Sequence, residues 1–314
     1  MRQSIRGYAD GVIELSGTAG QAPAGGRAGA PLGRLADELR AVRGLLDSSE
    51  DLRRVLTDTG VSALSRRAVV NDLLASRVGP LTLQLVNFAI EADRATEFAD
   101  NVSWLANRVE AATRGASSSS DHVLGHKAAE ERLDGFATAL LGPVEGAAAL
   151  TGIEDELFRF MRIVASADDL RAALSNRDVP QPARQSLVED LLRGKTSDTT
   201  VRLAAYTTRI GRPRDYEALL GFLVDRVASE NNRRLADVRA PVELDETQRR
   251  QLAQALAGVV GRNVEVRVTV DPKVLAGFVA TIGDTVVDGS ARHRLEILKE
   301  RLALPEATAS TGDS

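Results

Sequence analysis

Apolar residues recur at helical spacing along most of the first three quarters of the chain. In the segment Leu35–Leu46, leucine and valine side chains lie three and four positions apart, which places them on one face of a helix. The same spacing continues through the segments 65–78, 81–92 and 98–112, with Ser65 as an expected N-cap. A shorter amphipathic helix is expected over residues 3–15.

Two stretches interrupt this helical pattern. Residues 17–33 consist largely of Gly, Ala and Pro, so they predict a flexible loop that buries little surface. Residues 114–121 are polar and rich in serine, and they predict a domain boundary. A further helix is expected from about His122 to Leu141.

The helical part of the chain repeats itself once. With Asp37 placed above Asp155, an offset of 118 residues, 20 of the 73 positions from 37 to 109 are identical without a gap. Composition alone would give about a third of that number. The register holds across predicted loops as well as helices, which favours a duplicated structural unit over a chance match of two amphipathic helix sets.

The pattern changes beyond residue 232. Segments 233–244 and 263–270 alternate apolar and polar residues and predict strands, and between them Asp245 is the expected N-cap of a helix. Two shorter strands meet at Gly283-Asp284, which predicts a hairpin, and a closing helix is expected from Ser290.

The expected fold is therefore mainly α with a small α+β C-terminal domain: two tandem helical bundles followed by a strand-helix-strand-hairpin-helix unit. The predicted domains are a first bundle over residues 1–116, a second bundle over 117–232, an α+β domain over 233–304 and a disordered tail over 305–314.

Composition excludes several classes of function. The chain has a net charge of −4 and no cysteine, so nothing suggests nucleic-acid binding, disulfides or thiolate metal sites. His122 and His126 have metal-like spacing, but no glutamate lies between them and no third ligand is evident, so solvated surface histidines are favoured. No segment approaches the roughly 18 apolar residues that span a bilayer, so direct membrane insertion is not expected.

No catalytic, cofactor-binding or metal-binding set of residues is predicted. The glycine-rich stretch near residue 25 lacks the following Gly-Lys-Ser/Thr of a phosphate loop. Asp271, Asp284 and Asp288 could form a cation cluster, but their positions beside turns favour Asx-type turn formation. The chain is therefore not expected to be an enzyme by itself.

The run VTVDPKVLAGFVATIGDTVVDGSARHRLEILKERL, residues 268–302, carries a recognisable motif of strand, acidic residue, leucine, glycine pair and strand-turn-strand. The matching residues are Asp271, Leu275, Ala276-Gly277, Ile282-Gly283-Asp284 and Asp288-Gly289-Ser290. This motif resembles the C-terminal signature of the δ subunit of F-type ATP synthases, called the oligomycin-sensitivity-conferring protein in mitochondria. Ala276 replaces the commoner first glycine. Residues 145–230 resemble the N-terminal helical bundle of that family.

The resemblance implies a non-catalytic peripheral-stalk (stator) subunit. In the family, the helical bundle caps the catalytic α/β head and grips the N-terminal helices of α subunits, and the C-terminal unit holds the ends of the b helices. The implied partners are α, β and b subunits, with one copy per complex rather than a homo-oligomer. The implied location is the cytoplasmic face of the bacterial plasma membrane, without a cofactor.

The extra front copy resembles actinobacterial relatives, some of which carry a duplicated helical domain and are fused to the b subunit. No transmembrane b segment is present, so b is expected as a separate chain or outside this sequence.

Three groups of residues are candidates for roles in such an assembly. Apolar residues that could contact a partner, or equally form bundle core, are Tyr8, Ile13, Leu85, Leu203, Tyr206, Leu220 and Phe222. Arginines that recur in both copies, and that could anchor a loop or helix end or contact a partner, are Arg66, Arg94, Arg184 and Arg212. Signature residues expected to form structural turns are Asp271, Leu275, Gly277, Gly283, Asp288 and Gly289.

Two other functions stay open at this point. The chain could be a free-standing helical scaffold that recruits another protein, or an enzyme with an unrecognised site. Recovery of α, β and b chains in a pull-down would favour the stator subunit, and their absence would favour the scaffold.

Overall fold

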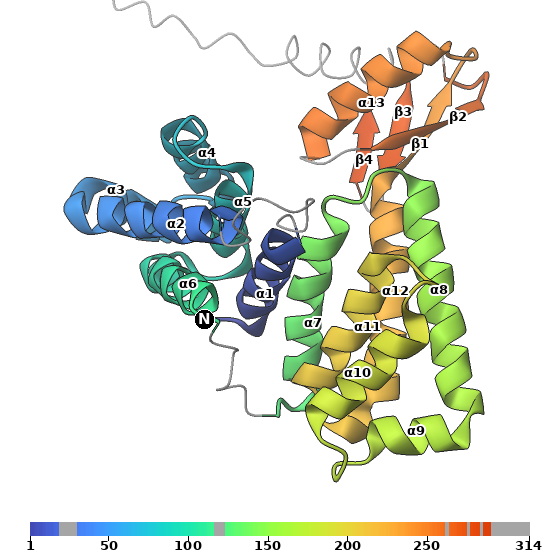
Figure 1. Cartoon of the computed structure of the whole chain (residues 1–314). Helices are drawn as coiled ribbons and strands as arrows, with labels where there is room; N and C mark the ends of the chain where they lie inside the picture. Colours follow the sequence, from blue (N-terminus) through green and yellow to red (C-terminus); the bar gives the residue numbers. More distant parts are fainter. Residues whose placement is uncertain (19–29, 116–122, 261–263, 275–276, 283–284, 290–314) are drawn as a thin grey trace, which may run out of the picture. The chain divides into compact units, whose positions relative to one another are not determined.

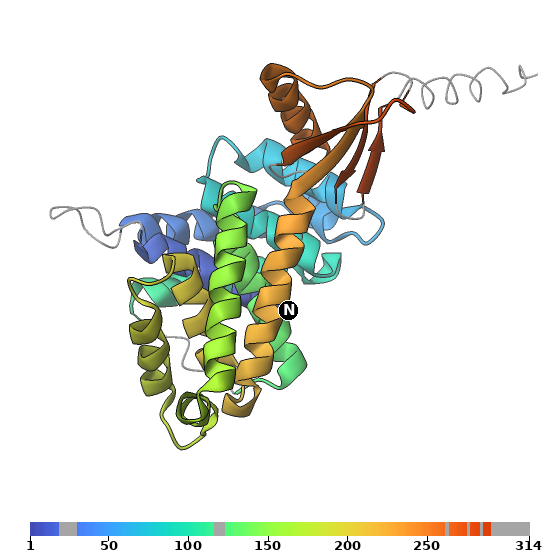
Figure 2. The same cartoon turned by 90° about the vertical axis from the view of Figure 1, so that its right-hand side faces the viewer.

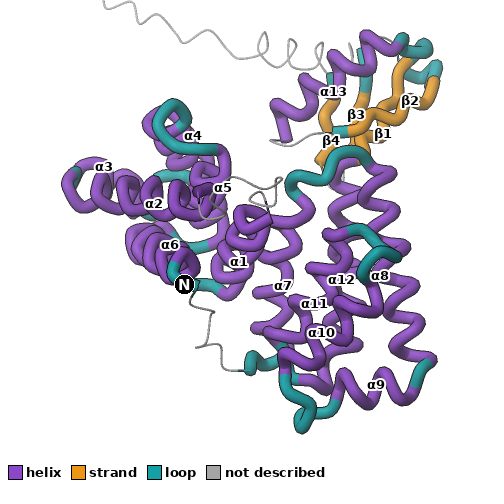
Figure 3. The backbone as a smooth tube through the Cα atoms, in the orientation of Figure 1, coloured by secondary structure: helices purple, strands orange, loops and turns teal. Residues whose placement is uncertain are grey.

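The computed structural model describes residues 1–18, 30–115, 123–260, 264–274, 277–282 and 285–289. Helices make up both copies of the repeat, and the strands described lie in the C-terminal part of the chain (Figure 3). The structure is therefore mainly α with a small α+β part, the class that the sequence predicts.

The helices of the two copies follow one another along the chain (Figure 1). The first copy contains α1 (Gln3–Thr18), α2 (Ala30–Ser48), α3 (Glu50–Thr57), α4 (Ala63–Leu74), α5 (Pro80–Ala92), the 3-10 turn η1 (Ala95–Glu97) and α6 (Phe98–Thr113). The second contains α7 (His126–Leu141), α8 (Ala147–Ser166), α9 (Asp168–Ser175), α10 (Gln181–Leu192), α11 (Asp198–Ile210), η2 (Pro213–Asp215) and α12 (Tyr216–Arg234).

The helix boundaries repeat with the offset found in the sequence. Elements α3, α4, α5 and η1 begin and end 118 residues before α9, α10, α11 and η2. Helices α2 and α8 end 118 residues apart, and α6 and α12 begin 118 residues apart. The duplication inferred from the sequence is thus present in the fold.

Polar contacts at helix ends repeat as well. The Glu38 carboxylate accepts a hydrogen bond from the Thr82 hydroxyl (2.5 Å) in the first turn of α5. Its counterpart Glu156 accepts from the Thr200 hydroxyl (2.6 Å) and from the backbone N–H of Ser197 (3.1 Å) at the start of α11. A carboxylate there satisfies free N–H groups and favours the positive end of the helix dipole. Each copy therefore uses a residue of its long second helix to fix the start of its fifth.

Both helical copies belong to one compact unit. This unit comprises residues 1–145 and 151–227, and a second unit comprises residues 146–150 and the described residues from 228 onward. Within the first unit, α1 packs on α5 and α6 of its own copy and on α7 of the other. Ala139 of α7 accordingly belongs to the same hydrophobic core as Ile5 and Val12 of α1. The domain boundary at residue 116 stays a prediction.

The C-terminal part forms a four-stranded sheet (Figure 2). Its elements are β1 (Leu235–Ala240), α13 (Glu246–Val260), β2 (Glu265–Val270), β3 (Val279–Ile282) and β4 (Thr285–Asp288), with the strand order β2-β1-β3-β4. Strands β1 and β2 are parallel and are joined through α13, whereas β3 pairs antiparallel with β1 and β4. Leu256 of α13 packs against Ala236, Val238 and Ala280 of the strands. One face of the sheet is thus covered by α13.

The sequence located the start of α13 correctly. The Asp245 side chain accepts from the Gln248 backbone N–H (2.8 Å), and the Gln248 side chain accepts from the Asp245 N–H (3.0 Å). This reciprocal pair is a capping box, and it fixes the first turn.

Several predicted boundaries are wrong in detail. The loop expected over 17–33 was predicted too long at both ends, because α1 continues through Thr18 and α2 begins at Ala30. The rest of that predicted loop lies outside the described residues. Pro31 can occupy the first turn of α2, since no backbone N–H is needed there. The N-cap of α4 is Ser62, whose hydroxyl accepts from the N–H of Ser65 (3.1 Å), so Ser65 itself lies inside the helix.

Two other elements also begin later than predicted. Helix α7 begins at His126, after Leu124 has formed an isolated bridge with Gly211 that holds its backbone extended. Helix α12 continues to Arg234, so β1 begins at Leu235 rather than at residue 233. The predicted closing helix from Ser290 and the predicted tail over 305–314 lie outside the described residues.

Candidate functional site: the junction between the two copies

Helices α1 and α7 cross at two glycines. A Cβ atom on Gly7 would overlap the carbonyl oxygen of Arg132, and one on Gly135 would overlap the carbonyl oxygen of Ser4. Because glycine has no Cβ, the two backbones can approach this closely. The crossing is the place where the first copy meets the second.

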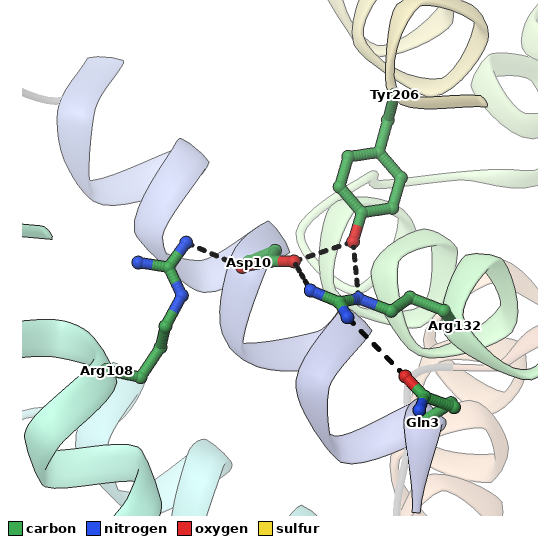
Figure 4. A network of polar contacts seen from close by, with 5 residues as sticks. All are labelled: Gln3, Asp10, Arg108, Arg132 and Tyr206. Carbon is green, nitrogen blue, oxygen red and sulfur yellow. Dashed lines mark hydrogen bonds and ion pairs between the residues drawn. The ribbon is translucent and has the colours of Figure 1, made fainter. Parts of the chain in front are cut away.

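A buried polar cluster lies beside this crossing (Figure 4). We call it the Asp10 cluster: Gln3, Asp10, Arg108, Arg132 and Tyr206. One Asp10 oxygen accepts from Arg132 Nη2 (2.8 Å) and from the Tyr206 hydroxyl (2.7 Å), and the other accepts from Arg108 Nη2 (2.9 Å). Arg132 also donates through Nε to Tyr206 (3.2 Å) and through Nη1 to Gln3 (3.5 Å). Two residues from the second copy thus bind a carboxylate of the first.

Burial and charge set the ionisation states in the Asp10 cluster. Burial by itself raises the pKa of Asp10, but the charges of Arg132 and Arg108 and the hydrogen bonds from Arg132 and Tyr206 outweigh it and hold the pKa below its ordinary value. Burial, reinforced by the charge of Asp10, raises the pKa of Tyr206 well above its ordinary value. Asp10 is therefore a carboxylate at neutral pH, and Tyr206 is a neutral hydroxyl that donates to it.

Part of the Asp10 cluster has a counterpart in the second copy. Arg108 pairs with Asp10 across α6 and α1, and 118 residues further on Arg226 pairs with Asp134 across α12 and α7 (2.7 Å). Asp10 is almost fully buried, whereas 43% of the Asp134 side chain is exposed. The two arginines are thus related by the repeat offset, but of the two ion pairs only the one at Asp10 also binds residues of the other copy.

Most of the predicted partner-binding residues lie in the core. Tyr8, Leu85, Leu203, Tyr206 and Leu220 are buried. Tyr8 stacks on Phe88, and Tyr206 stacks on Phe136 with ring centroids 3.6 Å apart. Ile13 is partly buried against the first core, and Phe222 is half-buried. Of these candidates, only Tyr206 belongs to the Asp10 cluster.

The repeated arginines fall into two kinds. Arg66 and Arg184 are buried, and each donates to backbone carbonyls near the end of the short third helix of its copy. The acceptors are Leu56 for Arg66 (3.4 Å) and Asn176 (3.2 Å) and Val179 (2.7 Å) for Arg184. Arg94 and Arg212 are exposed N-caps of η1 and η2, and their carbonyls accept the turn-closing hydrogen bonds.

The described signature residues occupy turns or strand ends. The Asp271 side chain accepts from the Lys273 N–H (3.0 Å), which is an Asx turn after β2. Gly277 has φ = +86°, a conformation that favours glycine. Gly289 donates its N–H to the Phe278 carbonyl (2.9 Å), and Asp288 ends β4 opposite Val279. Leu275 and Gly283 lie outside the described residues.

The sequence did not single out Asp10, Arg108 or Arg132 as a site. Two signals for it are nevertheless present. The alignment of the copies pairs Arg108 with Arg226, and an Asp-Gly dipeptide occurs both at Asp10 in α1 and at Asp134 in α7. An acid and a base that recur on two helices of each bundle would indicate an ion pair.

These features define a class of protein. Among the described residues, no group of three His, Cys, Asp or Glu side chains could hold a metal ion. The most organised polar site joins parts of the chain to each other. The chain is a duplicated helical-bundle protein with an appended α+β unit.

Comparison with known families identifies this architecture. The chain belongs to the ATP synthase delta (OSCP) subunit family, whose model matches residues 8–116 and 134–302. The first matched segment covers most of the first copy, and the second covers most of the second copy together with the C-terminal unit.

Individual relatives agree with this assignment. The chain is 37% identical over 270 residues to ATP synthase subunit delta of Streptomyces avermitilis, and the aligned region covers 86% of this chain and 89% of the relative. It is 36% identical over 275 residues to ATP synthase subunit delta of Kineococcus radiotolerans, with 88% and 90% covered. The same subunit of Thermobifida fusca is 34% identical over 271 residues, with 86% and 90% covered.

Proposed function

We propose that the chain is a non-catalytic peripheral-stalk (stator) subunit of a proton-translocating F-type ATP synthase. In this role it links the catalytic α/β head to the b subunit and resists the torque that rotation exerts on the head. Membership of the delta (OSCP) family supports this proposal, because relatives that match along most of their length carry the name ATP synthase subunit delta.

The observation that carries the proposal is the junction between the copies. A connector under torque must not bend between its parts, and a flexible linker would let the head rotate. Here the backbones of α1 and α7 are in contact at Gly7 and Gly135, and the buried Asp10 carboxylate binds groups of both copies. Such a junction resists separation without any chemical reaction, as a static link requires.

The proposed partners follow from the division of the chain. The helical copies would hold the N-terminal helices of α subunits on the α/β head, and the C-terminal unit would hold the ends of the b helices. One copy would be present per complex, at the cytoplasmic face of the bacterial plasma membrane. In the described part of the chain, no helix is long and apolar enough to cross a membrane.

Affinity capture tests the proposal. The full chain carries a tag at one end, is expressed in its native host and is captured from mild-detergent extracts, and mass spectrometry then quantifies the co-purified chains. We expect α, β and b to co-purify with this chain. Capture of the chain without α, β and b would overturn the stator role and favour a free-standing scaffold.

A further inference from the structure

Helices α1 and α7 take the same place in their respective copies. An offset of 128 residues places α1 on α7 and pairs buried apolar residues along both helices: Ile5 with Leu133, Tyr8 with Phe136, Ala9 with Ala137 and Val12 with Leu140. In each copy, the aromatic residue of this helix stacks on the matching residue of the fifth helix, Tyr8 on Phe88 and Phe136 on Tyr206. The two copies therefore meet through similar faces.

The contacts at the crossing are reciprocal. A Cβ atom on Gly7 would overlap the carbonyl oxygen of Arg132. Gly135 is the counterpart of Gly7, and a Cβ atom on it would overlap the carbonyl oxygen of Ser4, which is the counterpart of Arg132. Reciprocal contacts of this kind are the mark of a twofold interface, in which a surface binds a copy of itself. The crossing of α1 and α7 thus has the geometry of a self-recognition interface.

The Asp10 cluster is where this interface departs from twofold symmetry. Three of its members differ in chemistry from their counterparts: Asp10 corresponds to Thr138, Arg132 to Ser4, and Tyr206 to Phe88. The arginine of the sixth helix is common to both copies, since Arg108 donates to Asp10 (2.9 Å) and Arg226 donates to the Thr138 hydroxyl (3.0 Å). At these positions the carboxylate is found in the first copy alone, and the two groups that bind it across the crossing are found in the second copy alone.

This asymmetry determines which helices can pair. If α1 crossed the α1 of a second chain in the same geometry, Asp10 would face Ser4 and Phe88. Neither residue supplies a cation, and phenylalanine supplies no hydrogen-bond donor, so the carboxylate would keep only Arg108 as a strong partner. Burying a charge with too few partners is strongly unfavourable. Crossing α7 instead gives Asp10 a guanidinium and a hydroxyl as well.

The order of synthesis makes pairing of α1 with another α1 a real competitor. Arg132 follows Asp10 by 122 residues, so at 5–20 residues per second it is added about 6–24 s later. Until then, the face of α1 that α7 covers in the finished fold can meet only the α1 of neighbouring nascent chains. The proximity of α7 within the same chain gives no protection during this interval.

We propose that Asp10 is a specificity-determining residue, which prevents α1 from pairing with the α1 of a second copy of this chain. Asp10 thereby directs α1 to α7 of its own chain, where Arg132 and Tyr206 bind the carboxylate. A residue that penalises the wrong partner gives selectivity even where the apolar surfaces are alike. The proposal concerns the chain by itself and does not depend on its partners in an ATP synthase.

Co-expression of two differently tagged versions of the full chain tests this selectivity. After capture on the first tag, quantitative mass spectrometry measures the recovery of the second. We expect only background recovery from wild-type chains. Asp10→Thr gives α1 the residue that α7 has at this position, and it is expected to raise recovery at least 10-fold, because α1 can then pair with itself.

The matched control disrupts the same cluster from the other side. Arg132→Ser with Tyr206→Phe gives the second copy the residues of the first but leaves Asp10 in place, so pairing of α1 with α1 stays unfavourable. Helix α7 is then made when α1 of its own chain is already present, and recovery of the second tag is expected within twofold of wild type. Equal recovery from the control and from Asp10→Thr, or no increase with Asp10→Thr, would overturn the proposal.

A triple variant separates selectivity from loss of folding. Combining Asp10→Thr, Arg132→Ser and Tyr206→Phe makes the crossing symmetric, with each substituted residue the one found at the matching position of the other copy. We expect wild-type helical content by circular dichroism and the same high recovery as with Asp10→Thr. A folded triple variant that stays monomeric would overturn the proposal. A triple variant that does not fold would also overturn it, because the two faces would then not be equivalent.

Discussion

Replacing Asp10 by asparagine should weaken the junction between the copies more than any single surface change. Asp10 and Arg132 are 5% and 2% exposed, so the carboxylate and the guanidinium depend on each other for solvation. Removing one partner of a buried ion pair costs about 3–5 kcal/mol. Asparagine keeps one acceptor oxygen, so we expect a loss near the lower limit, about 3 kcal/mol. The NH2 group of the asparagine amide is a hydrogen-bond donor, and it would face Arg108 or Arg132, whose guanidinium groups need an acceptor.

The only tryptophan of the chain makes this loss measurable. Trp104 lies on α6 and is covered by the guanidinium of Arg6 from α1, at 5.4 Å from the ring centroid. Its fluorescence therefore reports on the first copy during urea unfolding. The matched control is Asp134→Asn, which removes the equivalent but partly exposed ion pair with Arg226 and should cost about 1 kcal/mol or less.

Two outcomes would refute the reasoning about Asp10. The first is a loss for Asp10→Asn no larger than that for Asp134→Asn. The second is that the losses in unfolding free energy of Asp10→Asn and Arg132→Met simply add in the double variant. Residues of one network must instead couple by about 0.5–3 kcal/mol. The apolar pair Asp10→Leu with Arg132→Met should recover much of the stability, since buried ion pairs are often replaceable by packed apolar side chains.

Three further predictions follow from the contacts described. Gly7→Ala should cost at least about 2 kcal/mol in urea unfolding, because its Cβ would overlap a backbone carbonyl of α7, whereas Gly44→Ala should stabilise by up to about 1 kcal/mol. The difference in unfolding free energy between wild type and Asp10→Asn should be constant above about pH 5 and shrink as the pH falls below about 4. The reason is that a carboxylate with a lowered pKa stabilises the fold only while it is ionised. A difference that grows in acid would contradict this. Glu156→Gln should cost about 1 kcal/mol and speed hydrogen exchange at the Ser197 amide, while exchange at the start of α5 stays unchanged.

Local patterns made much of the fold predictable. Helical spacing is a property of neighbouring residues, so α2, α4, α5 and α6 could be located without knowledge of tertiary contacts. The repeat could be found because the same spacing returns at one fixed offset. Asp245 could be identified as an N-cap because the bonds of a capping box lie within four residues.

The Asp10 cluster could not be predicted, because its partners lie far apart in the sequence. Tyr206 is 196 residues from Asp10, and Arg132 is 122 residues away. A single acidic residue in an amphipathic helix has the pattern of a solvated position, and only the packing of α7 on α1 buries it. For the same reason Gly7 was not distinguished from glycines that face solvent.

The most direct test of the stator role is the coupling of ATP hydrolysis to proton pumping in inverted membrane vesicles. Vesicles from cells that lack this chain should hydrolyse ATP without acidifying their interior, and addition of purified wild-type chain should restore acidification without raising hydrolysis. Vesicles that lack the chain and still acidify fully for each ATP hydrolysed would contradict the account.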